Sequence, residues 1–170
     1  MKKNRFVGRF ATFFLIAGLF SVIAFSCKEN DDDLVKPITI TDIILTNEQF
    51  SILRDIMLTA EMTDALRSQN FTLFAPNNAA FGKANIFAAS VITGPGKDSA
   101  RIFLQNHIIK KTMSYADLMK STSELTITQK TLNITKVDST VAINKSDIVI
   151  RDVNAANGLI QVIDSVAFRK

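Results

Sequence analysis

Cysteine and histidine are almost absent from this 170-residue sequence, which contains one of each. The cysteine, Cys27, has no partner within the chain with which it could form a disulfide. His107 is the only histidine that could act as the base for an activated nucleophile. Neither a glycine-rich phosphate loop nor a histidine and cysteine cluster with metal-ligand spacing is present. The sequence therefore predicts a non-enzymatic protein without a cofactor or metal.

An excess of charge is also missing once the N-terminus is set aside. The formal net charge is +4, and the first 26 residues supply all of it because they contain four basic residues and no acidic one. Residues 27–170 carry 16 basic and 16 acidic side chains. A balanced chain lacks the basic surface that attracts nucleic acid. We therefore expect no nucleic-acid partner.

The N-terminus has the three parts of an export signal, namely a basic start, the apolar run 10–25 and a small residue, Ser26, before Cys27. The 16 residues of the apolar run fall short of the roughly 20 that a membrane-spanning helix needs, which favours a cleaved signal over an uncleaved anchor. A cysteine at this point resembles the lipobox of bacterial lipoproteins. The resemblance implies cleavage between Ser26 and Cys27, lipidation of Cys27 with palmitate among its acyl chains, and a membrane partner through this anchor.

A charged segment, residues 28–36, follows the cysteine and has no periodic apolar face, so it predicts a solvated tether. Its charged positions resemble the surface-export signal of Bacteroidetes lipoproteins. That resemblance implies an outer-membrane location facing the cell exterior, and a plain linker on a periplasm-facing protein is the alternative. The residues of this expected signal are Lys28, Glu29, Asp31, Asp32 and Asp33.

Three parts of the chain are therefore expected. Residues 1–26 form the signal peptide, residues 27–36 form the lipidated cysteine with its acidic tether, and residues 37–170 form a single domain.

Within the domain the pattern predicts helices first and strands later. Thr46 followed by Gln49 fits a capping box, and apolar residues at spacings of three and four predict a helix from about 47 to 59. Successive helices and then strands indicate an α+β domain. Further expected elements are a short helical piece at 64–68, a surface turn at 90–99, a helical or strand-entering segment at 100–109, and strands at 125–128, 132–137, 141–143, 148–153 and 159–168.

Residues 71–75 carry large apolar groups on both faces and predict a strand buried between two layers. Pro76 has no N–H to donate, so the strand should end there. Asn77 or Asn78 is then expected to cap a new helix whose first residues pack on the core. All of these features have packing or capping explanations.

Three separated blocks resemble the fasciclin domain, a module of adhesion and matrix proteins and of many bacterial surface lipoproteins. They are FTLFAPNNAAF at 71–81, NHII at 106–109 and NAANGLIQVIDSVAF at 154–168, in the family's order and spacing. The resemblance implies a wedge of two small β-sheets with helices packed along one side. The matched positions, structural or binding in role, are Phe71, Thr72, Phe74, Ala75, Pro76, Phe81, His107, Asn157, Gly158, Ile163 and Asp164.

Two positions depart from the family pattern. Asn106 stands where the family has tyrosine, and Gln161 stands where it has histidine. The tyrosine and histidine region of animal members has been linked to integrin binding, so these departures argue against that activity here. His107 among apolar neighbours predicts a hydrogen-bonded structural residue, and Asp164 is expected to accept hydrogen bonds at the end of the sheet.

The favoured function is a lipid-anchored adhesion or ligand-binding module for an extracellular protein or glycan. The alternative is an accessory lipoprotein in a glycan-uptake or envelope-assembly complex. An enzyme would need an exposed serine or aspartate beside His107. Ser99 and Ser139, each after an aspartate, resemble the O-glycosylation sites of Bacteroidetes proteins.

Overall fold

The computed structural model describes residues 37–168, so the predictions for Ser26, Cys27 and the acidic tether lie outside the described residues. Pro37–Lys170 forms a compact unit of its own, and this unit contains two hydrophobic cores. A unit with its own cores can fold independently. In the part of the chain that the structure describes, no helix is long and apolar enough to cross a membrane.

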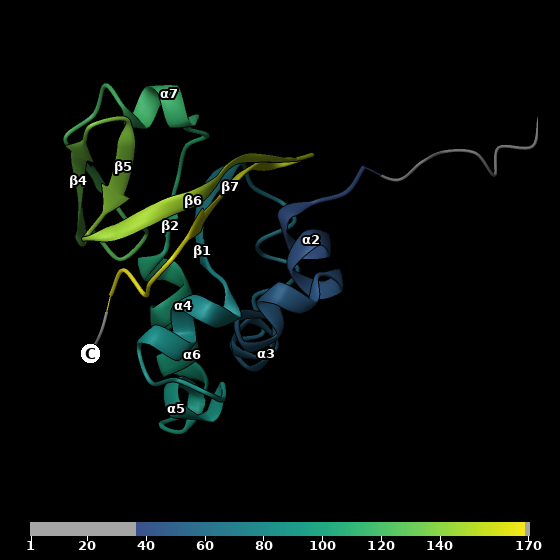
Figure 1. Cartoon of the computed structure of the whole chain (residues 1–170). Helices are drawn as coiled ribbons and strands as arrows, with labels where there is room; N and C mark the ends of the chain where they lie inside the picture. The colour runs from purple at the N-terminus through teal and green to yellow at the C-terminus, as the bar shows by residue number, and fades with distance from the viewer. Residues whose placement is uncertain (1–36, 169–170) are drawn as a thin grey trace, which may run out of the picture. The chain divides into compact units, whose positions relative to one another are not determined.

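Helices and short strands alternate in the first part of the domain, and strands dominate the second (Figure 1). The elements are α2 (Ile40–Thr46), the 3-10 helix η3 (Glu48–Phe50), α3 (Ser51–Thr59), β1 (Phe71–Pro76), α4 (Asn78–Lys83), α5 (Ser90–Thr93), α6 (Lys97–Asn106), β2 (Ile108–Ile109), α7 (Tyr115–Leu118), β3 (Ser123–Leu125), β4 (Thr131–Val137), β5 (Thr140–Ile143), β6 (Ser146–Ala155) and β7 (Gly158–Ile163).

The strands form one seven-stranded sheet in the order β2-β1-β7-β6-β5-β4-β3. Only β1 and β7 run parallel, whereas every other pair in this sheet is antiparallel. The ten-residue strand β6 pairs with both β7 and β5, and its register shifts twice against β7. Such irregularities bend a strand and increase its twist. The two small sheets expected from the sequence are therefore joined along β6, and the α+β fold is confirmed.

Each half of the seven-stranded sheet packs against its own hydrophobic core. One core packs α2, α3, α4 and α6 against β1 and β7, and Figure 1 shows α3–α6 gathered together away from β4 and β5. The other core lies among β4, β5, β6 and α7. All six residues of β1 are buried, with Leu73 in the first core and Phe74 in the second. The predicted burial of both faces of this strand is confirmed.

The capping box predicted for the helix at 47–59 is wrong. Thr46 ends an earlier helix, α2, and its Oγ1 donates to the Asp42 carbonyl at 2.8 Å. Asn47 instead accepts from the Gln49 N–H at 2.9 Å and starts a 3-10 turn, so that α3 begins only at Ser51. The competing cap explains the difference, because an asparagine side chain satisfies the same donors of the first turn.

Other predicted boundaries shift for local reasons. Residues 64–68 form turns, residues 90–93 form α5 within the predicted turn, and the last strand ends at Ile163. The strand expected at 125–128 lies instead at Ser123–Leu125. The hairpin turn to β4 begins at Thr126, whose N–H donates to the Lys130 carbonyl at 2.9 Å and whose carbonyl accepts from the Gln129 N–H at 3.0 Å, so the strand cannot continue to 128.

Candidate functional site

The first family block is built into the fold by its polar side chains. Thr72 is fully buried in β1, and its hydroxyl donates to the Lys111 carbonyl and accepts from the Met113 N–H, both at 2.8 Å. These two bonds hold the segment after β2 against β1. Asn77 follows the strand and accepts from the Ala80 N–H at 2.8 Å, so it is the N-cap of α4.

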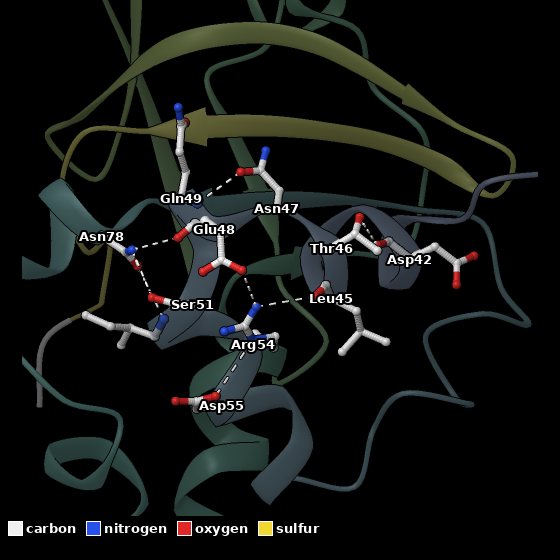
Figure 2. Close-up of polar contacts among 11 residues, drawn as sticks. Asp42, Leu45, Thr46, Asn47, Glu48, Gln49, Ser51, Arg54, Asp55 and Asn78 are labelled. Atoms are coloured by element: carbon white, nitrogen blue, oxygen red, sulfur yellow. Dashed lines mark hydrogen bonds and ion pairs between the residues drawn. The ribbon is translucent and has the colours of Figure 1, made fainter.

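Asn78 joins α4 to the start of α3, as Figure 2 shows. Its Nδ2 donates to the Glu48 carbonyl and to the Ser51 hydroxyl, both at 2.9 Å. Its Oδ1 accepts from the Ile52 N–H, in the first turn of α3, at 3.2 Å. Arg54 lies beside this joint, with Nη1 at 3.4 Å from a Glu48 carboxylate oxygen. The block therefore connects the helices and presents no reactive group.

Asn157, in the turn between β6 and β7, links three distant parts of the chain. Its Oδ1 accepts from the Ile40 N–H at 2.9 Å, at the start of α2. Its Nδ2 donates to the Leu66 carbonyl at 2.6 Å and to the Gln69 carbonyl at 3.2 Å. The side chain is buried, and its bonds to Ile40 and Leu66 are shielded from water. Asn157 therefore joins the β6–β7 turn to the start of α2 and to the segment before β1.

Gly158 follows with a φ of +137°, a conformation that residues with a Cβ rarely adopt. It pairs with Phe71 in the parallel ladder of β1 and β7. A Cβ added to Gly158 would lie 2.0 Å from the Phe71 carbonyl oxygen. The glycine is therefore required for the two family blocks to pair in this register.

Gln161, at the position where the family has histidine, is buried in β7 and holds the bulge of β6. Its Nε2 donates to Asp152 Oδ1 at 2.7 Å and to the Met113 carbonyl at 3.3 Å, while its Oε1 accepts from the Asp152 N–H at 3.1 Å. Asp152 Oδ1 also accepts from the Tyr115 N–H at 2.8 Å, at the start of α7. An amide can fill both roles here because it donates and accepts.

The only tyrosine in the sequence, Tyr115, was not singled out by the sequence patterns. Its hydroxyl donates to the Ser139 carbonyl at 2.8 Å and accepts from the Val141 N–H at 3.0 Å. The Arg151 guanidinium lies over its ring, 3.9 Å from the centroid. Tyr115 thus fixes the β4–β5 turn to α7. The only signal in the sequence was that Tyr115 is the single tyrosine, and this does not indicate which residues its hydroxyl bonds to.

Asp164 closes the end of β7. Its Oδ1 accepts from the Asp147 N–H at 2.9 Å, and its Oδ2 accepts from Lys83 Nζ at 2.6 Å. Partial burial acts to raise the pKa of Asp164, but the hydrogen bonds from Lys83 and from the Asp147 backbone outweigh it, so the pKa lies below its ordinary value. This is the acceptor role that the sequence predicted.

His107 is completely buried at the end of α6, between the rings of Phe103 and Phe168, whose centroids lie 4.5 Å and 6.0 Å from its own. Its Nδ1 lies 2.8 Å from the Phe103 carbonyl, which can only accept, so Nδ1 carries the proton. Burial lowers the pKa of His107 to about 4, against a smaller opposing effect of that hydrogen bond. Its Nε2 has no hydrogen-bond partner among residues 37–168. No described serine or aspartate is therefore bonded to the ring as a catalytic partner would be.

The matched positions do not converge on one surface. Phe71, Phe74, Ala75, Phe81 and Ile163 are core residues, and the polar positions serve the separate contacts described above. Within the described part of the chain, no group of three or more histidine, cysteine, aspartate or glutamate residues could hold a metal ion.

One apolar cavity of about 300 Å³ opens beside the His107 region, between α5, α6 and the segment after β7. We call it the α5–α6 pocket. The sequence patterns did not identify it, because its walls come from separate segments. Its lining residues are Ala84, Ile86, Val91, Ile92, Ser99, Ile102, Phe103, Asn106, Lys130, Val166 and Phe168.

The fold and these contacts define a structural α+β module whose motif residues stabilise the domain. The chain belongs to the fasciclin domain family, since the family model described as "Fasciclin domain" matches residues 48–168. Fasciclin domains are typically non-catalytic modules, and the family resemblance drawn from the three blocks is confirmed at this level.

Similar proteins come from bacteria and animals. Protein sll1483 of Synechocystis is 31% identical over 130 residues, which cover 75% of this chain and 72% of that protein. Protein sll1735 of the same organism is 29% identical over 128 residues, covering 75% of this chain and 95% of that protein. Transforming growth factor-beta-induced protein ig-h3 of Sus scrofa is 25% identical over 129 residues, and the match covers 75% of this chain but only 19% of ig-h3.

Among solved structures, the fold is similar to a FAS1 domain pair from the insect cell adhesion molecule Fasciclin I. The TM-score is 0.64 at 19% sequence identity, and the match covers 78% of this chain and 51% of that one. This chain thus spans about half of the domain pair. At this identity the similarity establishes the fold alone.

Proposed function

We propose that this chain is a lipid-anchored protein of the outer membrane, facing the cell exterior, whose fasciclin domain is a non-enzymatic adhesion or ligand-binding module. The observation that carries the proposal is the use of the motif side chains. Thr72, Asn157, Gln161 and Asp164 all bond within the domain, and His107 is buried and neutral at pH 7. These groups stabilise the fold, which leaves recognition to the domain surface.

The anchor in this proposal is Cys27, released as the first mature residue by cleavage after Ser26. More than one acyl chain at this cysteine would hold the protein stably at the membrane. In this proposal residues 28–36 serve as the solvated tether between the lipid and the domain. The acidic residues of this tether act as the export signal in the proposal.

The anchor is tested by growing cells with labelled palmitate and comparing the wild-type chain with Cys27→Ser. The wild type should carry the label and partition into detergent, and the variant should lose both properties. A matched serine substitution elsewhere, Ala88→Ser on the exposed surface, should leave labelling unchanged. Equal labelling of wild type and Cys27→Ser would overturn the anchor.

The location is tested by protease treatment of intact cells, with a periplasmic protein as the lysis control. The domain should be digested on intact cells, and replacing Asp31, Asp32 and Asp33 with asparagine should protect it. Digestion of the wild type only after the outer membrane is opened would overturn the exterior location and favour a periplasm-facing protein.

Adhesion is tested by comparing the attachment of cells with and without the protein to immobilised matrix proteins and glycans. Loss of attachment, restored by the wild-type gene, supports the adhesive role. Unchanged attachment together with co-purification with outer-membrane transport proteins would instead support the accessory role.

The glycosylation prediction for Ser99 and Ser139 also belongs to this proposal. Ser139 is exposed in the β4–β5 turn, whereas Ser99 is half-buried in the wall of the α5–α6 pocket. A glycan at Ser99 would therefore obstruct the pocket. Intact-mass and peptide spectra of the native protein measure both sites, and unmodified serines would end the prediction.

A further inference from the structure

The α5–α6 pocket combines an apolar interior with a polar rim. Ile86 and Phe103 form buried parts of its wall, at 8% and 7% exposure. Val91 and Ile102 lie at its mouth and remain 56% and 50% exposed. Exposed apolar side chains that border an apolar cavity gain free energy when a ligand removes them from water. A volume of about 300 Å³ lies at the small end of the range for small-molecule sites.

The basic side chain of Lys130 lies at the rim of the pocket. Lys130 follows the turn after β3, and its Nζ lies over the Phe168 ring, 5.6 Å from the centroid. The lysine side chain is exposed and forms no ion pair with any residue in the described range. The positive charge is thus available to an anionic group bound beside the apolar wall.

A hydrogen-bond donor without a partner also lines the pocket. Asn106, at the end of α6, is only 5% exposed, and its Oδ1 accepts from the Thr128 hydroxyl at 2.5 Å. This bond fixes the orientation of the Asn106 amide, so that the donor group Nδ2 points away from Thr128. Nδ2 donates to no acceptor among residues 37–168. Within the described range only His107 Nε2 is a fully buried side-chain nitrogen or oxygen without a partner, so Asn106 Nδ2 is accessible to solvent. A ligand oxygen in the pocket can replace water as its acceptor.

We propose that the α5–α6 pocket binds an anionic amphiphile of the fatty-acid type. The hydrocarbon chain lies against α5 and α6, and the carboxylate accepts from Asn106 Nδ2 and pairs with Lys130. Charge excludes a cationic amphiphile at this rim, and the two donors give a carboxylate an advantage over a neutral alcohol of the same chain length. The inference rests on the ligand-binding part of the proposed function and names the chemical class of the ligand.

Binding is measured by isothermal titration calorimetry on the domain comprising residues 37–170, with decanoate as the probe below its micelle concentration. Decanol and decyltrimethylammonium serve as neutral and cationic probes of equal chain length. Saturable binding of decanoate, weaker binding of decanol and no binding of the cation are expected. Absence of saturable decanoate binding, or equal binding of all three probes, would overturn the inference.

The rim is tested with Lys130→Gln. Because Lys130 is exposed and an exposed ion pair contributes up to about 1 kcal/mol, decanoate should bind about three- to fivefold more weakly to this variant. Decanol affinity should not change. Lys136→Gln is the matched control, since Lys136 is exposed on β4 and does not line the pocket. An equal loss in both lysine variants would show a general charge effect and refute a role for Lys130.

The interior is tested with Ile102→Glu, which places a carboxylate at the mouth of the pocket. This variant should bind neither decanoate nor decanol detectably, while its urea midpoint stays close to that of the wild type. Ile150→Glu is the control, because Ile150 is similarly exposed, at 45%, on β6 and outside the pocket. Wild-type decanoate affinity in the Ile102→Glu domain would place binding elsewhere and refute the assignment.

The two proposals fail in different experiments. Decanoate binding without any attachment defect in the deletion strain would overturn adhesion and leave the pocket assignment intact. A strain that loses attachment while its domain binds no decanoate would overturn the pocket assignment and leave adhesion intact.

Discussion

Acidification from pH 7 to pH 4.5 is expected to destabilise the domain through His107. The ring is completely buried, and burial lowers its pKa from 6.5 to about 4. Because the pKa in the folded state lies below that in the unfolded state, the unfolded chain binds more protons between these values. The stabilisation by neutral His107 is therefore fully present above pH 6.5 and falls as the pH drops toward 4.

The size of the effect follows from the difference between the two pKa values. A lowering from 6.5 to about 4 corresponds to about 3 kcal/mol of unfolding free energy when fully developed. About 2 kcal/mol of this change falls between pH 7 and pH 4.5. Carboxyl groups with a lowered pKa lose most of their stabilising contribution below this window, because the ordinary values are 3.8 for aspartate and 4.5 for glutamate. Asp42, for example, has a pKa of about 2 because hydrogen bonds from the Thr39 hydroxyl and N–H favour its charged form, so its contribution is lost only at lower pH.

The assay is urea unfolding of the domain at closely spaced pH values, with His107→Gln as the comparison. Glutamine keeps an amide donor for the Phe103 carbonyl but does not titrate. The wild type should lose about 2 kcal/mol more than the variant between pH 7 and pH 4.5, which is about 1 M in urea midpoint. Parallel pH profiles of the two proteins would refute the assignment of a buried, neutral histidine.

Three substitutions test the contacts of the family blocks, each by urea unfolding at pH 7. Gly158→Ala should cost about 3 kcal/mol or more, because the added Cβ meets the Phe71 carbonyl at 2.0 Å, while Gly82→Ala, with nothing within 4 Å, should be neutral or slightly stabilising. Asn157→Ala should cost about 3 kcal/mol by removing three hydrogen bonds, of which those to Ile40 and Leu66 are buried, and a cost below about 1 kcal/mol would contradict its linking role. Tyr115→Phe should cost about 2 kcal/mol and loosen the β4–β5 turn, as increased amide exchange there would show; unchanged exchange would contradict the two hydroxyl bonds.

The first family block was predictable because its signals act locally. Proline lacks a donor wherever it occurs, so Pro76 ends β1 in the structure as the sequence indicates. Asn77 caps α4 through a bond to a residue three positions away. Gly158, next to the turn between β6 and β7, has a positive φ, a conformation that glycine adopts readily. None of these features needs a distant part of the chain.

The α2 helix shows that two local patterns can compete in one stretch of sequence. Residues 38–41 alternate between isoleucine and threonine, a pattern of period two that favours a strand. In the structure Thr39 caps a helix together with Asp42, and Asn157 accepts from the Ile40 N–H across 117 positions of the sequence. The capping box is a local signal that competes with the alternation, and the bond to Asn157 adds a tertiary contact that the sequence does not show.

The sequence by itself determined the fold class, the family, and the strand and cap of the first family block, because these features depend on residues close together in the chain. Only the tertiary structure decided that Asn157 and Gln161 are internal links, that His107 is sealed from water, and that a pocket with Lys130 and Asn106 at its rim exists. Burial and cavities depend on segments brought together from distant positions. The spacing of residues along the chain does not show which distant segments pack together.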